Sequence, residues 1–311
     1  MKLHPARFIK EKAAEIKRVA KERKVLIAVS GGVDSVTCAF LAHRGVGNNL
    51  IVLFLDTGLM RENEPQEVVG IFSKIGIELQ VWEVQRNFFD ALKGKTDPEE
   101  KRKAFRDTFY RTLGQALKSY SADILVQGTI AADIVETQKG IKTQHNVLSQ
   151  IGINPATFGL KICEPLKELY KDQVRVVARH LGVPKTVCER KPFPGPGLSV
   201  RIIGEVTPER VEIVRTATTI VEHELRIPSV FQAFPVLFND HATGMVGGRR
   251  VLGEIIAIRA VESKNALTAT PCALTWARMA SVRDKIIRRL PQVVKVVYDI
   301  TAKPPSTIEY I

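Results

Sequence analysis

The sequence predicts an α/β protein: a doubly wound parallel sheet followed by a smaller α+β domain. In the first 190 residues, short apolar runs alternate with helical stretches, and a glycine-rich turn follows the first long apolar run. The segment RKPFPGPG (190–197) is rigid and non-regular, which indicates a domain boundary. Beyond it, strands and helices no longer alternate strictly, as is typical of an α+β arrangement.

The first elements lead into a candidate phosphate-binding loop. Residues 5–22 form an amphipathic helix, and VLIAV (25–29) is predicted to be a strand buried on both faces. The turn SGGVDS (30–35) then precedes a helix over 36–44. Glycines let the backbone approach an anion, and a helix N-terminus presents unpaired N–H groups to it. Strand, turn and helix together therefore predict a phosphate site.

The spelling of this loop excludes two other phosphate loops. A Walker A loop has a lysine before its final Ser or Thr, and the GxGxxG spacing is absent. The alternative is a tight turn that binds nothing. The strand before the turn, the helix after it and the Asp-Ser ending favour a phosphate loop.

The rest of the first domain continues the alternation. Asp56 and Gly128 follow two further predicted strands, at the edge where open α/β sheets bind ligands. The predicted strands are 50–55, 77–84 and 124–127, and the predicted helices are 62–74, 97–120 and 165–181.

Residues 136–160 have no clear period and contain scattered Gly, Asn and Pro. A loop of this length is usually a functional lid or a disordered segment. Lys142 and His145 lie within it, and Asp133 and Glu136 lie at or just before its start. A histidine in a loop is often only solvated, but the nearby lysine and acids make these residues lid candidates.

In the second domain the pattern predicts one short extended segment, three strands and two helices. They cover residues 200–203 (extended), 230–238, 254–261 and 293–300 (strands), and 208–225 and 276–290 (helices).

Composition limits the class of partner. A net charge of +13 and a pI near 9.6 favour anionic partners, which include nucleotides, an acidic subunit or RNA. An aromatic share of 6% offers no stacking platform, so we do not expect nucleic acid as a partner. The four cysteines form no CxxC pair, which argues against a zinc site and suits a reducing cytosol. No apolar run approaches membrane-spanning length, so we expect a cytoplasmic protein.

Several stretches together match one family. They are SGGVDS (30–35), DPEEKRK (97–103), QGT (127–129), IKTQHN (141–146), EPLKELYKDQVR (164–175), RKPFPGPGLSVR (190–201) and VVYDITAKPPSTIE (296–309). They resemble the ATP pyrophosphatase part of GMP synthetase over nearly the whole chain. The loop is shared by several ATP pyrophosphatases, whereas the proline-glycine segment and the tail KPPSTIE (303–309) separate this family from NAD synthetase and tRNA thiolation enzymes.

The resemblance implies a fold and a reaction. The fold is a doubly wound sheet of the adenine-nucleotide α-hydrolase type over residues 1–190, followed by an α+β dimerisation and substrate domain over 191–311. In the reaction, the C2 oxygen of xanthosine monophosphate (XMP) attacks the α-phosphorus of ATP and releases pyrophosphate. Ammonia then displaces AMP from C2 to give GMP.

The resemblance also assigns residues by function. Asp34, Ser35 and Lys171 are the implied catalytic residues, and Asp34 would assist in holding Mg²⁺. The lid is residues 136–160, with Asp133, Glu136, Lys142 and His145. The implied ATP-binding residues are Ser30, Gly31, Gly32, Val33, Asp34, Ser35, Asp56 and Gly128, and the implied XMP-binding residues are Arg102, Gln232, Lys303 and Glu309.

Larger members of the family carry a glutaminase domain in front of this one. Here about 24 residues precede the first long apolar run, which is too short for such a domain. We therefore expect the small-subunit form, which receives ammonia from a separate glutaminase subunit. A homodimer through the C-terminal domain is also expected from the resemblance.

The sequence departs from the family pattern in three places. Thr57 stands where Asn is usual, the ending Tyr310-Ile311 replaces Trp-Glu, and Gly248 lies where the family has an aspartate. Two rival readings remain open. A tRNA-thiolating enzyme would share the loop but would need a reactive cysteine. A nucleotide sensor without catalysis would fit the departures, but it need not retain the loop, Lys171 and the tail.

Overall fold

The computed structural model describes residues 3–138, 161–264 and 266–311. The chain divides into two compact units, each made from separate stretches of the sequence. The first comprises Met1–Asp56, Glu64–Glu83 and Asp107–Arg190, and the second comprises Thr57–Asn63, Val84–Arg106 and Lys191–Ile311. Parts of the first half of the sequence, Arg102 included, therefore belong to the second unit.

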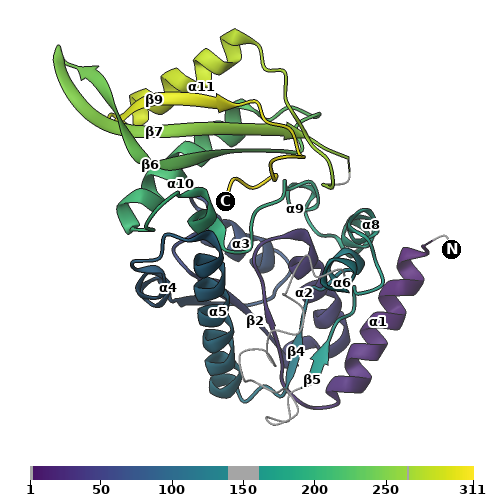
Figure 1. Cartoon of the computed structure of the whole chain (residues 1–311). Helices are drawn as coiled ribbons and strands as arrows, with labels where there is room; N and C mark the ends of the chain where they lie inside the picture. Colours follow the sequence, from purple (N-terminus) through teal and green to yellow (C-terminus); the bar gives the residue numbers. More distant parts are fainter. Residues whose placement is uncertain (1–2, 139–160, 265) are drawn as a thin grey trace. The chain divides into compact units, whose positions relative to one another are not determined.

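The described part of the first unit contains a parallel sheet of five strands in the order β3-β2-β1-β4-β5. Figure 1 labels β2, β4 and β5 of this sheet. The strand order reverses between β1 and β4. In open α/β sheets, ligands bind outside the carboxyl ends of the strands at such a switch point. The strands are β1 (Val25–Ala28), β2 (Leu50–Asp56), β3 (Leu79–Glu83), β4 (Ile124–Val126) and β5 (Lys161–Cys163).

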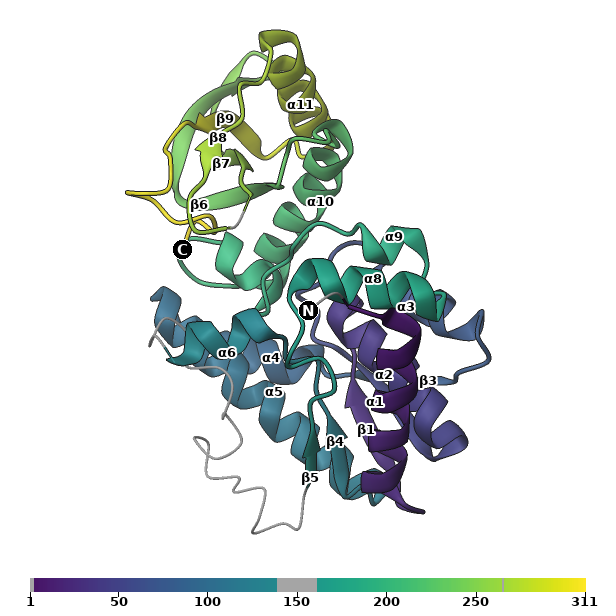
Figure 2. The same cartoon turned by 90° about the vertical axis from the view of Figure 1, so that its right-hand side faces the viewer.

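Helices cover both faces of this sheet, which explains why β1 is apolar throughout. Val25, Leu26 and Ile27 are fully buried. Figure 2 shows α1 and α2 on one side of the sheet and α5 on the other. The helices of the first 190 residues are α1 (Pro5–Ala20), α2 (Val33–Val46), η1 (Gly47–Asn49), α3 (Glu64–Ser73), α4 (Gln85–Leu92), α5 (Pro98–Tyr120), α6 (Ala131–Gln138), α8 (Lys171–Leu181) and α9 (Lys185–Cys188).

The predicted helix over 165–181 is wrong in its first part, because α8 begins only at Lys171. Its start is fixed by Gln173, whose side-chain oxygen accepts the backbone N–H of Tyr170 at 2.9 Å. The helix α6 reaches Gln138, so the first residues of the predicted loop over 136–160 are helical. Lys142 and His145 lie outside the described residues.

The described part of the second unit contains a sheet of four strands around β7. β6 and β8 are antiparallel to β7, and β9 is parallel to it. The helices α10 (Pro208–Glu224) and α11 (Trp276–Arg289) pack against each other and against β6 and β9. The strands are β6 (Gln232–Val246), β7 (Arg249–Glu262), β8 (Thr270–Pro271) and β9 (Val293–Asp299).

Two predictions for this unit need correction. Residues 200–203 are not simply extended, because a short 3₁₀ helix, η2 (Gly197–Arg201), takes up the first two of them. It is held where the backbone N–H of Leu198 donates to Leu59 O at 2.8 Å. The strands β6 and β7 are also longer than predicted, since they continue as a hairpin to the two-residue turn Gly247-Gly248.

Among the described residues, no helix is long and apolar enough to cross a membrane.

Candidate active site

Residues 30–35 comprise the turn before α2 and the first three residues of that helix, at the switch point of the sheet. Gly31 has a φ of +74°, a left-handed conformation that glycine adopts readily. A Cβ atom at this position would lie 2.8 Å from Val68 Cγ2 and 2.9 Å from Arg190 Nη1. Gly32 precedes α2 with an extended backbone and has no side chain to obstruct the helix N-terminus. The first backbone N–H groups of α2 are therefore available to an anion.

Two hydroxyl groups hold the loop in this shape. Ser35 Oγ accepts the backbone N–H of Ser30 at 3.2 Å and donates to Gly32 O at 3.1 Å. Ser30 Oγ lies 3.3 Å from Ser35 Oγ and accepts the N–H of Gly32 at 3.4 Å. Val33 is buried and anchors the start of the helix. The loop is thus organised by its own side chains.

Asp34 and Lys171 form an ion pair beside the loop. Lys171 Nζ donates to Asp34 Oδ2, and the lysine side chain is 45% exposed. Burial raises the pKa of Asp34 above its ordinary value, against the opposing effect of Lys171; nearby Asp133 adds to the rise and Arg175 opposes it. Among the described residues, the buried Asp34 Oδ1 has no hydrogen-bond partner.

The turn after β4 packs directly on the loop. A Cβ atom at Gly128 would lie 3.2 Å from the backbone nitrogen of Ser35, so a side chain there would press on the loop backbone. Asp133 Oδ2 accepts the N–H of Ile130 at 3.0 Å, which fixes the start of α6. Asp56 is the last residue of β2 and is half-buried. Lys171 pairs with Asp34 beside the loop, and Asp133 is near enough to act electrostatically on Asp34.

In the second unit, Gln232 and Glu309 are brought together although they are far apart in sequence. Gln232 Nε2 donates to Glu309 Oε1 at 2.5 Å. Gln232 is buried, and a quarter of the Glu309 side chain is exposed. This pair presents one amide and one carboxylate at a single place.

The other two predicted XMP-binding residues donate to backbone carbonyls in different parts of the second unit. Arg102 Nη2 donates to Ile311 O at 2.6 Å, two residues beyond Glu309. Lys303 Nζ donates to Ala266 O at 2.9 Å. Arg102 therefore lies near the end of the tail that carries Glu309, whereas Lys303 lies nearer its start.

Arg259 organises this tail and was missed by the sequence reasoning. It is fully buried on β7. Its guanidinium donates to Ile308 O at 2.8 Å, Thr307 O at 2.6 Å and Thr301 O at 3.0 Å, and to Asp299 Oδ2 at 2.5 Å. The available signal was an arginine inside the otherwise apolar strand IIAIRAV.

The departures from the family pattern have defined places. Gly248 is the second residue of the turn between β6 and β7. Tyr310 packs against the buried cluster of Phe234, Val236 and Ala257, with its ring centroid 5.9 Å from that of Phe238. Tyr310 thereby anchors the tail next to Glu309.

None of the four cysteines has the features of a reactive thiol. Cys38, Cys163, Cys188 and Cys272 are all buried. Burial raises the pKa of each thiol, to about 11 for Cys163 and Cys272. A catalytic thiolate needs a lowered pKa and access to its substrate. These surroundings oppose the thiolation hypothesis.

The loop, the switch point and Lys171 define a class of protein. Residues 5–184 match the PP-loop domain family, and the first unit is a PP-loop ATP pyrophosphatase domain. Among solved structures, the NMN synthetase of Francisella tularensis is similar in fold, with a TM-score of 0.51 and 19% identity. That similarity covers 68% of this chain and 85% of the other.

Residues 219–310 match a second family, the GMP synthase C terminal domain. The B-type subunit of the glutamine-hydrolysing GMP synthase of Archaeoglobus fulgidus is 50% identical over 98% of both chains. The protein of the same name from Methanopyrus kandleri is 45% identical over 98% of this chain and 99% of its own. The chain belongs to this family of B-type GMP synthase subunits.

Proposed function

We propose that this chain is the synthetase subunit of a two-subunit GMP synthase, which converts XMP to GMP with ATP and ammonia. The observation that carries the proposal is the combination of the loop 30–35 at the switch point, with Lys171 beside it, and a tail that joins Glu309 to Gln232. The first arrangement suits a triphosphate, and the second suits the edge of a purine.

In the first step the C2 oxygen of XMP forms a bond to the α-phosphorus of ATP. The bond from that phosphorus to the oxygen bridging to the β-phosphorus breaks, and negative charge accumulates on the departing pyrophosphate. The N–H groups at the start of α2 and the Lys171 ammonium would stabilise that charge. The hydrogen bonds of Ser30 and Ser35 hold the loop ready, so little reorganisation is needed during the reaction.

Mg²⁺ is the expected companion of ATP, and Asp34 suits it. Mg²⁺ binds through one or two carboxylates together with phosphate oxygens. Asp34 Oδ2 is paired with Lys171, whereas the buried Oδ1 has no partner among the described residues and is a free acceptor. Asp34 would hold the ion, directly or through water, and the bound ion would neutralise charge on the phosphates.

In the second step ammonia attacks C2 of the adenylated intermediate, and AMP leaves with the former C2 oxygen. Water would compete at this carbon, so the intermediate needs protection. We assign that task to the lid over 136–160, with Asp133 and Glu136 at its start and Lys142 and His145 within it. For XMP, Arg102 and Lys303 would meet the phosphate, and Gln232 and Glu309 the purine edge.

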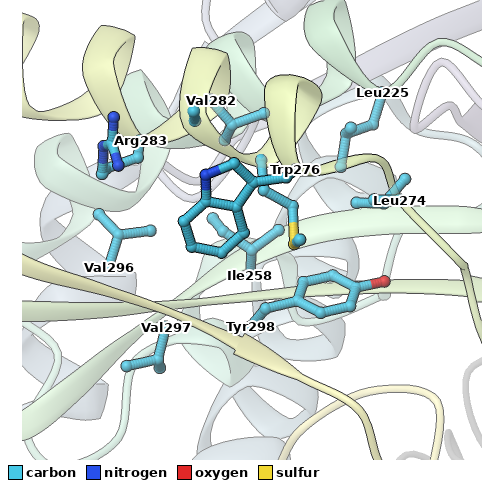
Figure 3. Close-up of a pocket in the computed structure, with 11 residues that line it drawn as sticks. Leu225, Ile258, Leu274, Trp276, Val282, Arg283, Val296, Val297 and Tyr298 are labelled. Carbon is cyan, nitrogen blue, oxygen red and sulfur yellow. The ribbon is translucent and has the colours of Figure 1, made fainter.

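Two protein partners belong to the proposal. The relatives are named as subunits of a glutamine-hydrolysing synthase, and we propose that a separate glutaminase subunit supplies the ammonia here too. We also propose a homodimer through the second unit. Its described surface exposes large apolar side chains, with Trp276 75% and Ile300 76% exposed. Figure 3 shows Trp276 over a pocket also lined by Ile258 and Tyr298.

The deciding experiment is a screen of acceptors. Purified chain receives ATP, Mg²⁺ and ammonium with XMP, inosine monophosphate, nicotinic acid adenine dinucleotide or tRNA, and AMP release is measured. We expect AMP and GMP to form in equal amounts with XMP alone. AMP release with another acceptor would overturn the substrate assignment, and binding without AMP release would favour a nucleotide sensor.

A further inference from the structure

The segment 190–201 begins and ends with an arginine that the proposed mechanism does not use. Arg190 is the last residue of the first unit, and Lys191 begins the final stretch of the second. Within the segment, Lys191 Nζ donates to Val230 O, and Gly197 is so close to Leu59 that a Cβ would lie 2.3 Å from its carbonyl oxygen. The segment is therefore fixed at several points.

Arg190 contacts the backbone of the phosphate loop at Gly31. Its Nη1 donates to Gly31 O at 3.3 Å and to Glu64 Oε1 at 2.9 Å, and its Nη2 donates to Glu67 Oε2 at 2.5 Å. Glu64 is only 2% exposed, so the guanidinium is held from the α3 side by a buried carboxylate. A peptide unit is planar and trans, so fixing Gly31 O also fixes the direction of the Gly32 N–H.

Arg201 makes a comparable contact with Glu309. Its side chain is 1% exposed, and its guanidinium carbon lies 4.9 Å from the Phe193 ring centroid and 4.4 Å from that of Phe234. Its Nε and Nη2 each lie 3.4 Å from a different oxygen of Glu309. The two aromatic rings restrict the guanidinium, so its edge faces the carboxylate.

We infer that Arg190 and Arg201 are positioning residues for two different ligands: Arg190 aligns the phosphate loop for ATP, and Arg201 aligns Glu309 for XMP. The inference rests on the proposed function, because it takes the loop as the ATP site and Glu309 as part of the XMP site. Neither arginine needs to touch a nucleotide.

Lysine cannot reproduce either contact. The guanidinium is a planar fork with several donors in fixed directions, whereas the ammonium of lysine is a compact charge on a flexible stem. At position 190, one group must serve a carbonyl and two carboxylates together. At position 201, it must meet both oxygens of one carboxylate while its guanidinium carbon lies 4.9 Å and 4.4 Å from two ring centroids. Arg→Lys therefore keeps the charge but loses the alignment.

The test compares Arg190→Lys with Arg201→Lys, each serving as the control for the other. α,β-Methylene-ATP with Mg²⁺, and XMP alone, are titrated separately into both variants and the unaltered chain by calorimetry. We expect Arg190→Lys to weaken binding of the ATP analogue at least fivefold and binding of XMP less than twofold. We expect the reverse for Arg201→Lys.

A double variant that removes both charges tests whether a loss of binding is caused by misfolding. Arg190→Met alone would remove the cation that pairs with the buried Glu64, so it is combined with Glu64→Gln, and melting temperatures are recorded for all variants. The double variant should fold and still bind the ATP analogue at least fivefold more weakly.

Equal weakening of both nucleotides by each variant, or no weakening by either, would overturn the inference and leave the arginines as purely structural. If the unaltered chain binds neither nucleotide, the proposed function fails first, and the positioning roles fail with it.

Discussion

At the loop, the two carboxylate oxygens of Asp34 have different surroundings. One accepts from Lys171, and the other is buried without a partner among the described residues. We predict that Asp34→Asn lowers the rate of pyrophosphate release about 10²- to 10³-fold, as is typical for loss of one preorganised electrostatic group. Because the pKa of Asp34 is raised, the rate should begin to fall at a higher pH than it would with an aspartate of ordinary pKa.

The measurement for Asp34→Asn is phosphate release coupled to a pyrophosphatase, with a melting curve to show that the fold persists. The control is Asp172→Asn, an exposed aspartate next to Lys171. A variant at position 34 with near-normal turnover would remove this carboxylate from the mechanism.

Lys303 carries a second prediction at the residue scale. Its Nζ donates only to a backbone carbonyl, that of Ala266, in the contacts described for it. Its ammonium keeps donors for a ligand. We predict that Lys303→Ala weakens binding of XMP about ten- to a hundredfold and leaves ATP binding unchanged. This is the loss expected for a charge-assisted hydrogen bond. Titration of each nucleotide, with the exposed Lys264→Ala as control, would show whether this lysine contributes to binding.

At this scale the sequence predicts residues that belong to short motifs and misses those defined by distant partners. The local sequence motif and the family resemblance predict Ser30, Asp34 and Lys171 as site residues. Arg190 and Arg259 do not, because their importance depends on a loop carbonyl 159 residues away and on tail carbonyls 42 to 49 residues away. Gln232 and Glu309 were paired only through the resemblance, and their direct hydrogen bond is a result of the structure.

At the scale of elements, the predicted helices and strands agree with the structure better in type than in where they begin and end. The apolar period identified the strands of the first sheet apart from the short β5, whereas α8 starts later than predicted because a side-chain cap at Gln173 decides its first turn. The 3₁₀ helix η2 replaced part of a predicted extended segment because its backbone follows the contact with Leu59, which no local pattern encodes. The hairpin extension of β6 and β7 depends on cross-strand pairing in the same way.

The junction of α10 and α11 gives a prediction on stability and pH. Glu224 accepts from Lys285 Nζ at 2.6 Å, Ser281 Oγ at 2.8 Å and His223 Nδ1 at 2.9 Å. These hydrogen bonds lower its pKa to about 2. A lowered carboxyl pKa stabilises the fold above the unfolded value near 4.5, and this contribution is lost as the pH falls toward 2.

We therefore predict that Glu224→Gln lowers the free energy of unfolding at pH 6 by about 1–2 kcal/mol, after allowing for solvent screening. The difference from the unaltered chain should shrink below pH 4 and vanish near pH 2. Urea unfolding at several pH values measures it, with the exposed Glu262→Gln as control. A difference that stays constant with pH would mean that the effect is packing and not charge.

At the scale of the whole molecule, the two units interleave in sequence. Residues 57–63 and 84–106 belong to the second unit through contacts that no local pattern contains. Arg61 Nε meets Glu222 Oε1 at 2.8 Å, and Lys101 Nζ donates to Ile202 O at 2.7 Å, across 161 and 101 residues respectively. The alternation of strands and helices predicts the fold class, but membership of a unit depends on such long-range pairs.

The proposed homodimer can be tested on the exposed apolar surface of the second unit. We predict that Trp276→Glu, which puts a charge on a side chain 75% exposed beside an apolar pocket, shifts a dimer to monomer. Light scattering after size exclusion measures the mass, and Ile75→Glu on the first unit is the matched control. A chain that is monomeric before substitution would overturn the dimer proposal, and a Trp276→Glu dimer would place the interface elsewhere.

The source of the nitrogen gives the last prediction. A synthetase subunit without glutaminase chemistry should make GMP from ammonium salts but not from glutamine. The lone pair of NH₃ attacks C2 and NH₄⁺ has none, so at fixed total ammonium the rate should rise about tenfold per pH unit while ammonium remains the main form. Rates at several pH values, replotted against NH₃ concentration, should then fall on one curve. If the curves for different pH values stay separate, the pH dependence comes from ionisable groups of the protein. GMP formed from glutamine by the chain alone would contradict the need for a second subunit.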